Sequence, residues 1–167
     1  MAISTSGKVR LFIGSTNVPD QSGSDSAIIS AYEADFAATG AVEIGEIEDP
    51  GEFGDEFNPV TFTALADSRV RKLKGSADAG TQTMTVAFDA GDAGQDALRA
   101  AKQDTSQADY NFMVMLNDVT NGVSTPTVFY YSGKVMSRRI QPGQADNVVR
   151  ASITVGINTA VFEVSAA

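Results

Sequence analysis

The chain has 167 residues, of which 43% are hydrophobic and 20% charged, and it carries a net charge of −9 with neither cysteine nor histidine. Its length suits one domain with a substantial core, and its acidity argues against nucleic-acid binding by phosphate neutralisation. The missing residue types exclude disulfides, thiolate metal sites and catalysis that depends on histidine or cysteine.

The first part of the chain alternates between strands and loops. Residues 9–13 predict a strand and residues 18–26 a turn-rich loop. Residues 28–39 fit a strand by their period-two alternation, although their alanines and Glu33 also suit a helix; we favour the strand. Residues 42–48 predict another strand, whose apolar face changes near Gly45 as in a β-bulge.

Residues 49–80 read as a long loop around one short strand. An acidic loop (residues 49–59) leads into a strand (60–65), and a basic extended stretch (66–80) follows. Loops of this length are usually functional or disordered, so we expect a role for this one.

A strand, a helix and a strand come next. Residues 83–88 and 110–116 alternate with the period of half-buried strands. Asp92 stands at an N-cap position with Gln95 three residues later, an aspartate variant of the capping box. We therefore predict a helix over residues 93–102, rich in helix formers.

The last part of the chain predicts further strands. Asn121-Gly122 is a hairpin-turn signal. The expected strands cover residues 127–140, with an interruption near 132–133, residues 147–157, and residues 161–164. The whole pattern predicts a single mainly β domain, a two-sheet sandwich or barrel-like subunit with one flanking helix and a long inter-strand loop.

No motif in the chain carries catalysis. A P-loop and a dinucleotide-binding glycine fingerprint are both missing. Asp89, Asp92 and Asp96 have helix-entry spacing and lack the alternate spacing of calcium loops, so we interpret them as a strand end, an N-cap and a first-turn acid. We expect no enzyme activity, metal or cofactor; a carboxylate pair for glycoside hydrolysis is the weaker alternative.

Charge is strongly segregated along the chain. Residues 43–56 hold seven of the 21 acids, and residues 69–74 hold four of the 12 bases. Either the two arms of a hairpin pair with each other, where exposed pairs contribute only ~0–1 kcal/mol each, or they pair with a neighbouring copy. Phe53 and Phe57 lie in this charged segment, and exposed aromatics favour an interface, so we favour self-assembly.

Several segments in order resemble a known family. They read GEIEDPGEFG (45–54), VTFTALAD (60–67), KGSADAG (74–80), the strand ending at residue 88, GQDAL (94–98), YNFMV (110–114) and YSGKV (131–135). Their order, spread over residues 42–157, resembles the major tail tube proteins of long, non-contractile-tailed, lambda-like phages and of related gene transfer agents.

That resemblance implies a structural virion protein. Six subunits would form a ring, and rings would stack into the tube through which DNA is ejected. The long loop at 49–80 would reach the adjacent ring, and the terminal arms at 1–8 and 159–167 would help to join rings. The residues predicted to make contacts between subunits and rings are Glu52, Phe53, Asp55, Glu56, Phe57, Arg69, Arg71, Lys72 and Lys74.

The resemblance also gives the acidity a use, because a lumen lined by carboxylates repels DNA phosphates. The predicted lumen residues are Glu33, Asp35, Glu43 and Glu46, since they fall in predicted strands; they would otherwise face outer solvent. The implied partners are copies of the chain itself, tape measure, tail terminator and distal tail proteins, with no membrane and no specific DNA binding. We expect synthesis in a bacterial cytoplasm and residence in the virion. Alternatives are a tail terminator, a secretion-system tube or, less favoured, a monomeric carbohydrate-binding sandwich.

Overall fold

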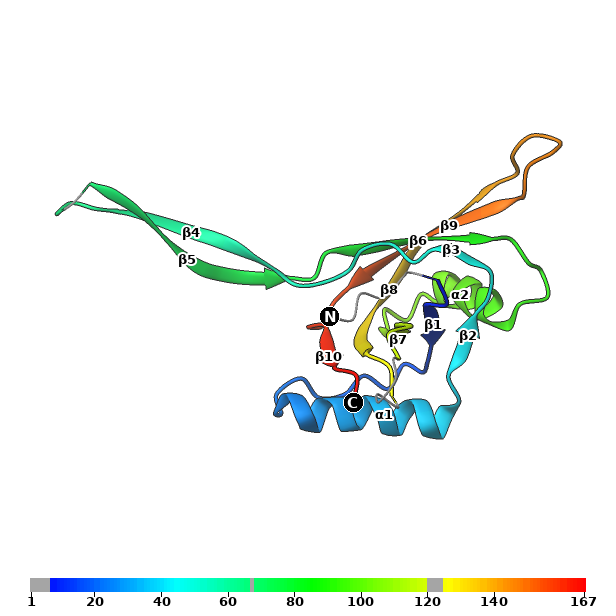
Figure 1. The fold of residues 1–167 in the computed structure, drawn as a ribbon, viewed down its shortest axis with the longest axis horizontal. Coiled ribbons are helices and arrows are strands. Elements are labelled where there is room, and N and C mark those ends of the chain that lie inside the picture. Colours follow the sequence, from blue (N-terminus) through cyan, green and yellow to red (C-terminus); the bar gives the residue numbers. More distant parts are fainter. Residues whose placement is uncertain (1–6, 67, 120–124) are drawn as a thin grey trace.

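The computed structural model describes residues 7–66, 68–119 and 125–167 (Figure 1). Within them the chain forms ten strands and two helices, which confirms the predicted mainly β class. The strands are β1 Arg10–Ile13, β2 Val42–Ile44, β3 Ile47–Asp49, β4 Glu56–Ala64, β5 Arg69–Asp78, β6 Thr81–Ala87, β7 Tyr110–Met115, β8 Val128–Gln141, β9 Arg150–Ile157 and β10 Phe162–Val164. The helices are α1 Asp25–Thr39 and α2 Ala93–Gln103. No helix in these residues is long and apolar enough to cross a membrane.

Eight of the strands form one curled, antiparallel sheet in the order β2-β1-β7-β8-β9-β6-β3, with β10 beside β8. The strands at the two ends of this order, β2 and β3, follow each other in the chain. The predicted single strand over residues 42–48 is thus wrong in one respect. At Gly45 the chain leaves one edge of the sheet and joins the other, helped by the left-handed backbone of Glu46 (φ 56°).

The main core lies inside this sheet and is closed by α2. Its buried residues include Leu11, Ile13, Ile44, Met84, Val86, Leu98, Phe112, Val114, Tyr131, Ala151, Ile153 and Val155. The alternation predicted for residues 147–157 is confirmed by the four buried residues of β9, and α2 occupies the predicted helical segment. Gly94 lets α2 approach β2 closely, because a Cβ there would lie 2.2 Å from the Glu43 carbonyl oxygen.

Asp92 caps α2 as predicted. Its carboxylate accepts from the backbone N–H of Gln95 at 2.7 Å and also from that of Gly45 at 3.2 Å. The Gln95 amide accepts from the Asp89 N–H and donates to the Ala87 carbonyl, so it ties the end of β6 to the helix. Asp89 and Asp92 therefore serve the strand-to-helix connection, and Asp96 lies in the first turn of α2 as predicted.

Replacing Asp92 with alanine is expected to lower the free energy of unfolding by about 1–2 kcal/mol, because a helix cap is lost together with the bond to Gly45. Urea denaturation measures the change. The matched control is Asp96→Ala one turn later, which removes only an exposed pair with Arg99 and should cost less than ~0.5 kcal/mol. Equal losses in the two variants would contradict the capping role.

Helix α1 corrects the prediction of a strand over residues 28–39. Its buried residues are Ile28, Tyr32, Asp35 and Phe36, a spacing that belongs to one face of a helix. This face packs on the outer side of the sheet against Phe12, Met113, Val128 and Tyr130. The period-two alternation was misleading because alanine and acidic residues fill the exposed side of the helix.

Two further predictions about the later strands are settled. Strand β8 runs without a break through residues 132–133, so the expected interruption is wrong, and its irregularity lies between Val135 and Ser137. The terminal strand is confirmed as β10, which pairs with the β8 of its own subunit. The turn signal at Asn121-Gly122 and the arm at residues 1–6 lie outside the described residues.

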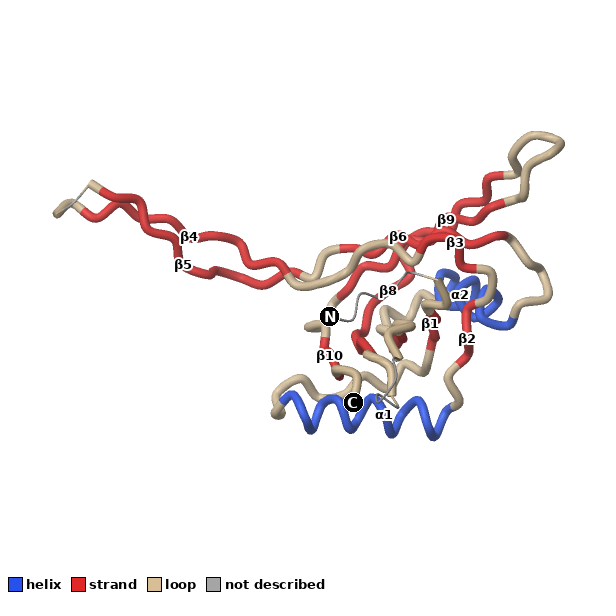
Figure 2. The backbone as a smooth tube through the Cα atoms, in the orientation of Figure 1, coloured by secondary structure: helices blue, strands red, loops and turns tan. Residues whose placement is uncertain are grey.

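The segment expected to be a long loop is a β-hairpin that projects from the body (Figures 1 and 2). Strands β4 and β5 pair with each other to form a separate two-stranded sheet. We call residues 56–78 the arm. It differs from the predicted loop because both of its strands have alternating, strand-forming sequences. The two strands pair, so the backbone N–H and C=O groups of one are satisfied by those of the other.

Candidate assembly surface

The arm has two chemically different faces, set by its register. Residues directly opposite each other in an antiparallel pair share a face. One face, here the apolar face, carries Val60, Phe62, Ala64, Arg69, Arg71 and Leu73. The other, the threonine face, carries Pro59, Thr61, Thr63, Val70, Lys72 and Lys74.

The apolar face is largely exposed to water. The exposed fractions of Val60, Phe62 and Leu73 are 53%, 46% and 58%. Among the described arm residues, none belongs to either core cluster of the subunit. Large apolar side chains gathered on one side of a projecting ribbon are typical of a surface that another molecule covers.

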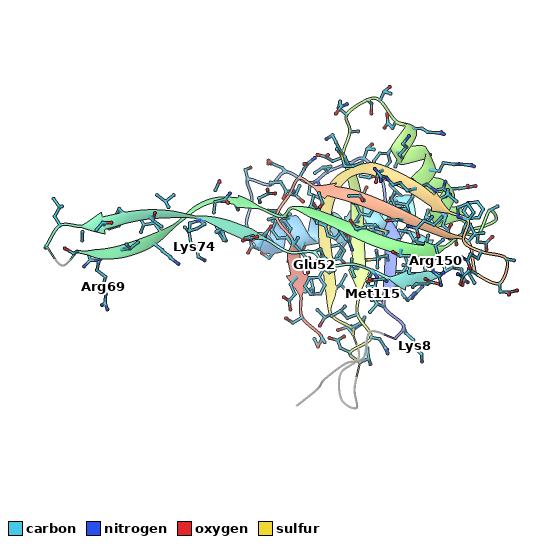
Figure 3. The ribbon with its side chains drawn as sticks, turned by 90° about the horizontal axis from the view of Figure 1, so that it is seen from above. Lys8, Glu52, Arg69, Lys74, Met115 and Arg150 are labelled. Carbon is cyan, nitrogen blue, oxygen red and sulfur yellow. The ribbon has the colours of Figure 1, made fainter. Side chains whose placement is uncertain are left out.

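The four predicted basic contact residues all lie on the arm, divided between its faces. Arg69 stands close to the tip and Lys74 nearer the body (Figure 3). The Lys74 ammonium lies 4.6 Å from the centre of the Phe57 ring, so these two predicted contact residues touch each other. Phe57 is still 44% exposed. The structure brings these side chains onto one element, as the charge segregation suggested.

The root of the arm is fixed to the body by buried contacts. The side-chain amide of Gln82, which is fully buried, donates to the Pro50 carbonyl at 2.8 Å and accepts from the Tyr131 hydroxyl. Gly51 (φ 72°) passes close to β6, where a Cβ would lie 2.1 Å from the Thr83 carbonyl oxygen. These contacts fix the position from which the arm leaves the body.

Two residues predicted to contact a neighbour also make contacts within their own subunit, at this root. The Phe53 ring packs against Phe129 and Tyr131 of its own subunit, with centroid distances of 5.3 and 5.8 Å. The Asp55 carboxylate accepts from the Val161 N–H at 3.3 Å. Phe53 looked like an exposed anchor in the sequence because its core partners lie far along the chain.

Acidic side chains gather at the arm's base. Glu52, Glu56 and Asp78 line a groove of about 340 Å³ together with Phe53 and backbone of residues 79–81. Carboxylates therefore gather at the root of the arm, and the four basic residues are spread along β5 from Lys74 near the root to Arg69 near the tip. Of the described residues, no three acidic side chains are arranged to hold a metal ion.

The acids predicted to line a lumen lie on three different elements. Glu33 and Asp35 are on α1, so their placement in a strand is wrong. Glu43 is on β2, and Glu46 follows it in the connection to β3. Glu33 lies close to Tyr130, and burial together with the Glu33 charge raises the pKa of Tyr130 to about 12.

Two of these acids have partners within the subunit. Arg10 donates to both carboxylate oxygens of Glu43 at 2.6 and 2.8 Å, which lowers the pKa of Glu43. Asp35 is only 6% exposed and accepts from the Ser15 hydroxyl and the Asn111 amide at 2.8 and 2.9 Å. Asp35 is thus a core residue and leaves the set of lumen candidates.

Sequence reasoning missed the most exposed apolar residue on the arm. Leu65, at the tip, is 98% exposed, and Val70 beside it is 59% exposed. Neither residue follows the apolar alternation of residues 60, 62 and 64, and Val70 lies opposite Thr63 on the threonine face, so no periodic signal in the sequence marked them.

Comparisons with known proteins identify the fold. No family model matches the chain, and no curated protein matches its sequence. A chain in the structure of the anti-feeding prophage baseplate matches with a TM-score of 0.69 at 10% identity, covering 99% of this chain and 97% of that one. The SPP1 tail tube gives 0.63 at 17% identity with 98% and 80% coverage. A chain in the sheath/tube terminator of PVC, an extracellular contractile injection system, gives 0.63 at 9% identity with 99% of both chains covered. The chain therefore has a fold that occurs in the SPP1 tail tube, the anti-feeding prophage and PVC.

Proposed function

We propose that this protein is a structural subunit of a phage-type tail tube, and that it assembles by placing its arm on a neighbouring copy. The single observation that carries the proposal is the arm, whose apolar side chains stay exposed in the isolated subunit. Full burial of such a side chain contributes roughly 1.5–3 kcal/mol, and covering the exposed half of Val60, Phe62 and Leu73 contributes about half of that for each. The shared fold with the SPP1 tail tube supports the same role.

In its full form, the proposal has six subunits in a ring and stacked rings forming the conduit for DNA ejection in a siphophage-like virion. The contacts between rings come from the exposed arm residues, Phe57, Arg69, Arg71, Lys72 and Lys74, and from Glu52 and Glu56 at its root. Negative-stain microscopy of the concentrated protein should show rings or tubes. A strictly monomeric protein under all conditions would overturn the proposal.

Charge reversal on the arm is expected to weaken assembly without unfolding the subunit. Arg71→Glu with Lys72→Glu, one change on each face, should raise the concentration needed for assembly by about tenfold or more, since each lost or reversed ion pair costs ~1 kcal/mol. Light scattering against concentration measures it. The matched control reverses two exposed charges on the body, Lys102→Glu with Arg139→Glu. If the arm variant instead melts earlier and assembles normally, its cations serve the subunit.

The acidic lumen remains part of the proposal for Glu33 and Glu46, with Glu43 weakened by its pairing to Arg10. Carboxylates on the inner wall would keep phosphates from binding, so that DNA passes without sticking. Glu33→Gln with Glu46→Gln should leave tubes intact and slow DNA ejection in an infection assay. Unchanged ejection would place these two acids on the outer wall.

A tube terminator is the second candidate, because terminators of the anti-feeding prophage and PVC share the fold. A terminator ring would cap a tube formed by another protein and stop at one ring. Mass measurement of the assembled particles separates the two functions, since a tube subunit gives particles that lengthen with concentration. Tape measure and distal tail proteins are the other partners that a tail tube implies.

A further inference from the structure

The tip of the arm ends in an apolar side chain that its own subunit does not cover. Leu65 is 98% exposed, and Val70 on the same end of the ribbon is 59% exposed. The arm carries this tip away from the body (Figure 1). A leucine presented in this way on a projecting hairpin has the form of a knob that enters a hollow on another molecule.

The body offers an apolar hollow at its other end. Ile13, Val42, Ala97, Ala100 and Tyr110 line a cavity of about 310 Å³ between β1, β2 and α2. This volume lies at the lower end of the roughly 300–1,000 Å³ typical of pockets for small ligands, which suits one or two side chains. Its walls are mostly small or aliphatic, so they match a leucine and give little to a charged ligand.

Part of the rim of this hollow carries the partial negative charge of a helix C-terminus. Thr39 and Gly40, at the C-terminal end of α1, form part of it, and the last turn of that helix contains no basic residue. The negative end of a helix dipole attracts cations. The Tyr110 hydroxyl in the wall donates to the Asp104 carboxylate at 2.9 Å, which brings a second negative group near. Arg69, which lies opposite Ala64, is the cation nearest to Leu65 along the ribbon, and its charge complements this rim.

The positions of the two features fit a head-to-tail contact. In Figure 1 the arm leaves one end of the body, whereas β2, α2 and the C-terminal end of α1 lie at the opposite end. An arm that points away from its own hollow cannot fill it, which leaves the hollow open to the arm of a second copy. Contacts between two different patches on identical subunits close into rings or continue as filaments.

We propose, on the basis of the proposed function, that the arm of one copy docks in this hollow of the next. Leu65 is then buried between β2 and α2, and Arg69 lies beside the C-terminal end of α1. The hollow between β1, β2 and α2 is thus the receiving site of the assembly. The acidic groove at the arm's root stays outside this contact.

Two variants, each defective on one side of the contact, test the proposal. Leu65→Asp removes the knob at a fully exposed position, and Ala100→Trp fills the hollow from an exposed helix position. Each variant alone should remain monomeric at concentrations where the wild type assembles. Mixed at equal concentration, they should form a 1:1 dimer and nothing larger, because only one intact knob and one intact hollow can meet. Sedimentation velocity distinguishes monomer, dimer and larger species.

The controls distinguish a wrong docking site from a misfolded variant and from a wrong proposed function. Thr61→Ser on the threonine face and Lys102→Trp on α2 should assemble as the wild type does, and Ala100→Lys should repeat the effect of Ala100→Trp by placing a charge in the hollow. Circular dichroism melting checks that every variant is folded. A mixture that stays monomeric, or either defective variant assembling alone, would overturn the docking site while leaving arm-based assembly standing. A wild type that never assembles would overturn the proposed function itself.

Discussion

Removing the arm is expected to abolish assembly while leaving the rest of the subunit folded. Both core clusters are built from the helices, the curled sheet and residues near the root, so they lose nothing when residues 57–77 are deleted. Glu56 lies directly opposite Asp78 at the base of the ribbon. An Asn-Gly pair can join them, because this dipeptide forms the two-residue turn that closes antiparallel strands.

The shortened protein should melt within a few degrees of the full chain and stay monomeric in sedimentation velocity. Two pairs of substitutions on β4 then show which face of the arm assembly needs. Val60→Ser with Phe62→Ser alters the apolar face, and Thr61→Ser with Thr63→Ser alters the threonine face. We expect only the first pair to prevent assembly. A deletion variant that still forms rings would show that the arm is dispensable for them.

The arm is also expected to be the least protected part of the free subunit. An isolated two-stranded ribbon is at most marginally stable in water, and this one has no core beneath it. Docking would bury its apolar face and order it, so part of the contact energy goes into ordering the arm. Because docking and ordering of the arm are coupled, assembly should start slowly and become faster when preformed tubes are added.

Much of the body could be predicted because its signals are local. The alternation of β9 and the capping of α2 by Asp92 each depend on residues within one element. Helix α1 could not be settled in this way, since its sequence fits both periods. What decides it is packing between distant segments, because the buried face of α1 lies on residues of β1, β7 and β8, and the Tyr32 hydroxyl lies 2.7 Å from that of Ser132, 100 residues away.

The arm and the proposed assembly surface could be predicted only in part, for a similar reason. The charge segregation pointed to residues 49–80, but the tip sequence Leu65-Ala66-Asp67-Ser68 has no glycine or asparagine to announce a hairpin turn. Without the turn there is no register, and without the register the apolar and threonine faces cannot be told apart. The hollow is still less visible, because Ile13, Val42 and Ala97 come from three separate elements.

Replacing Asp35 with alanine is expected to destabilise the subunit by about 3 kcal/mol, because it leaves the Ser15 hydroxyl and the Asn111 amide without their shared acceptor in a buried site. The effect extends further along a chain of hydrogen bonds. The side-chain oxygen of Asn111 accepts from the Ser132 hydroxyl at 2.7 Å, and the same hydroxyl is hydrogen-bonded to the Tyr32 hydroxyl of α1. The network begins at Asp35 and ends at Tyr32, both on α1, and passes through Asn111 and Ser132 of the sheet, so it joins the helix to the sheet at two points.

This result separates a core role for Asp35 from the lumen role suggested by the sequence. The matched control is Glu33→Ala, an exposed change on the same helix that should alter the free energy of unfolding by less than ~0.5 kcal/mol. Urea denaturation at neutral pH compares the two. Asp35→Asn should recover part of the loss, since its carbonyl oxygen still accepts one hydrogen bond while its amide cannot accept the second. If the Asp35→Ala protein is stable and its tubes release DNA slowly, Asp35 lines the channel as the sequence suggested.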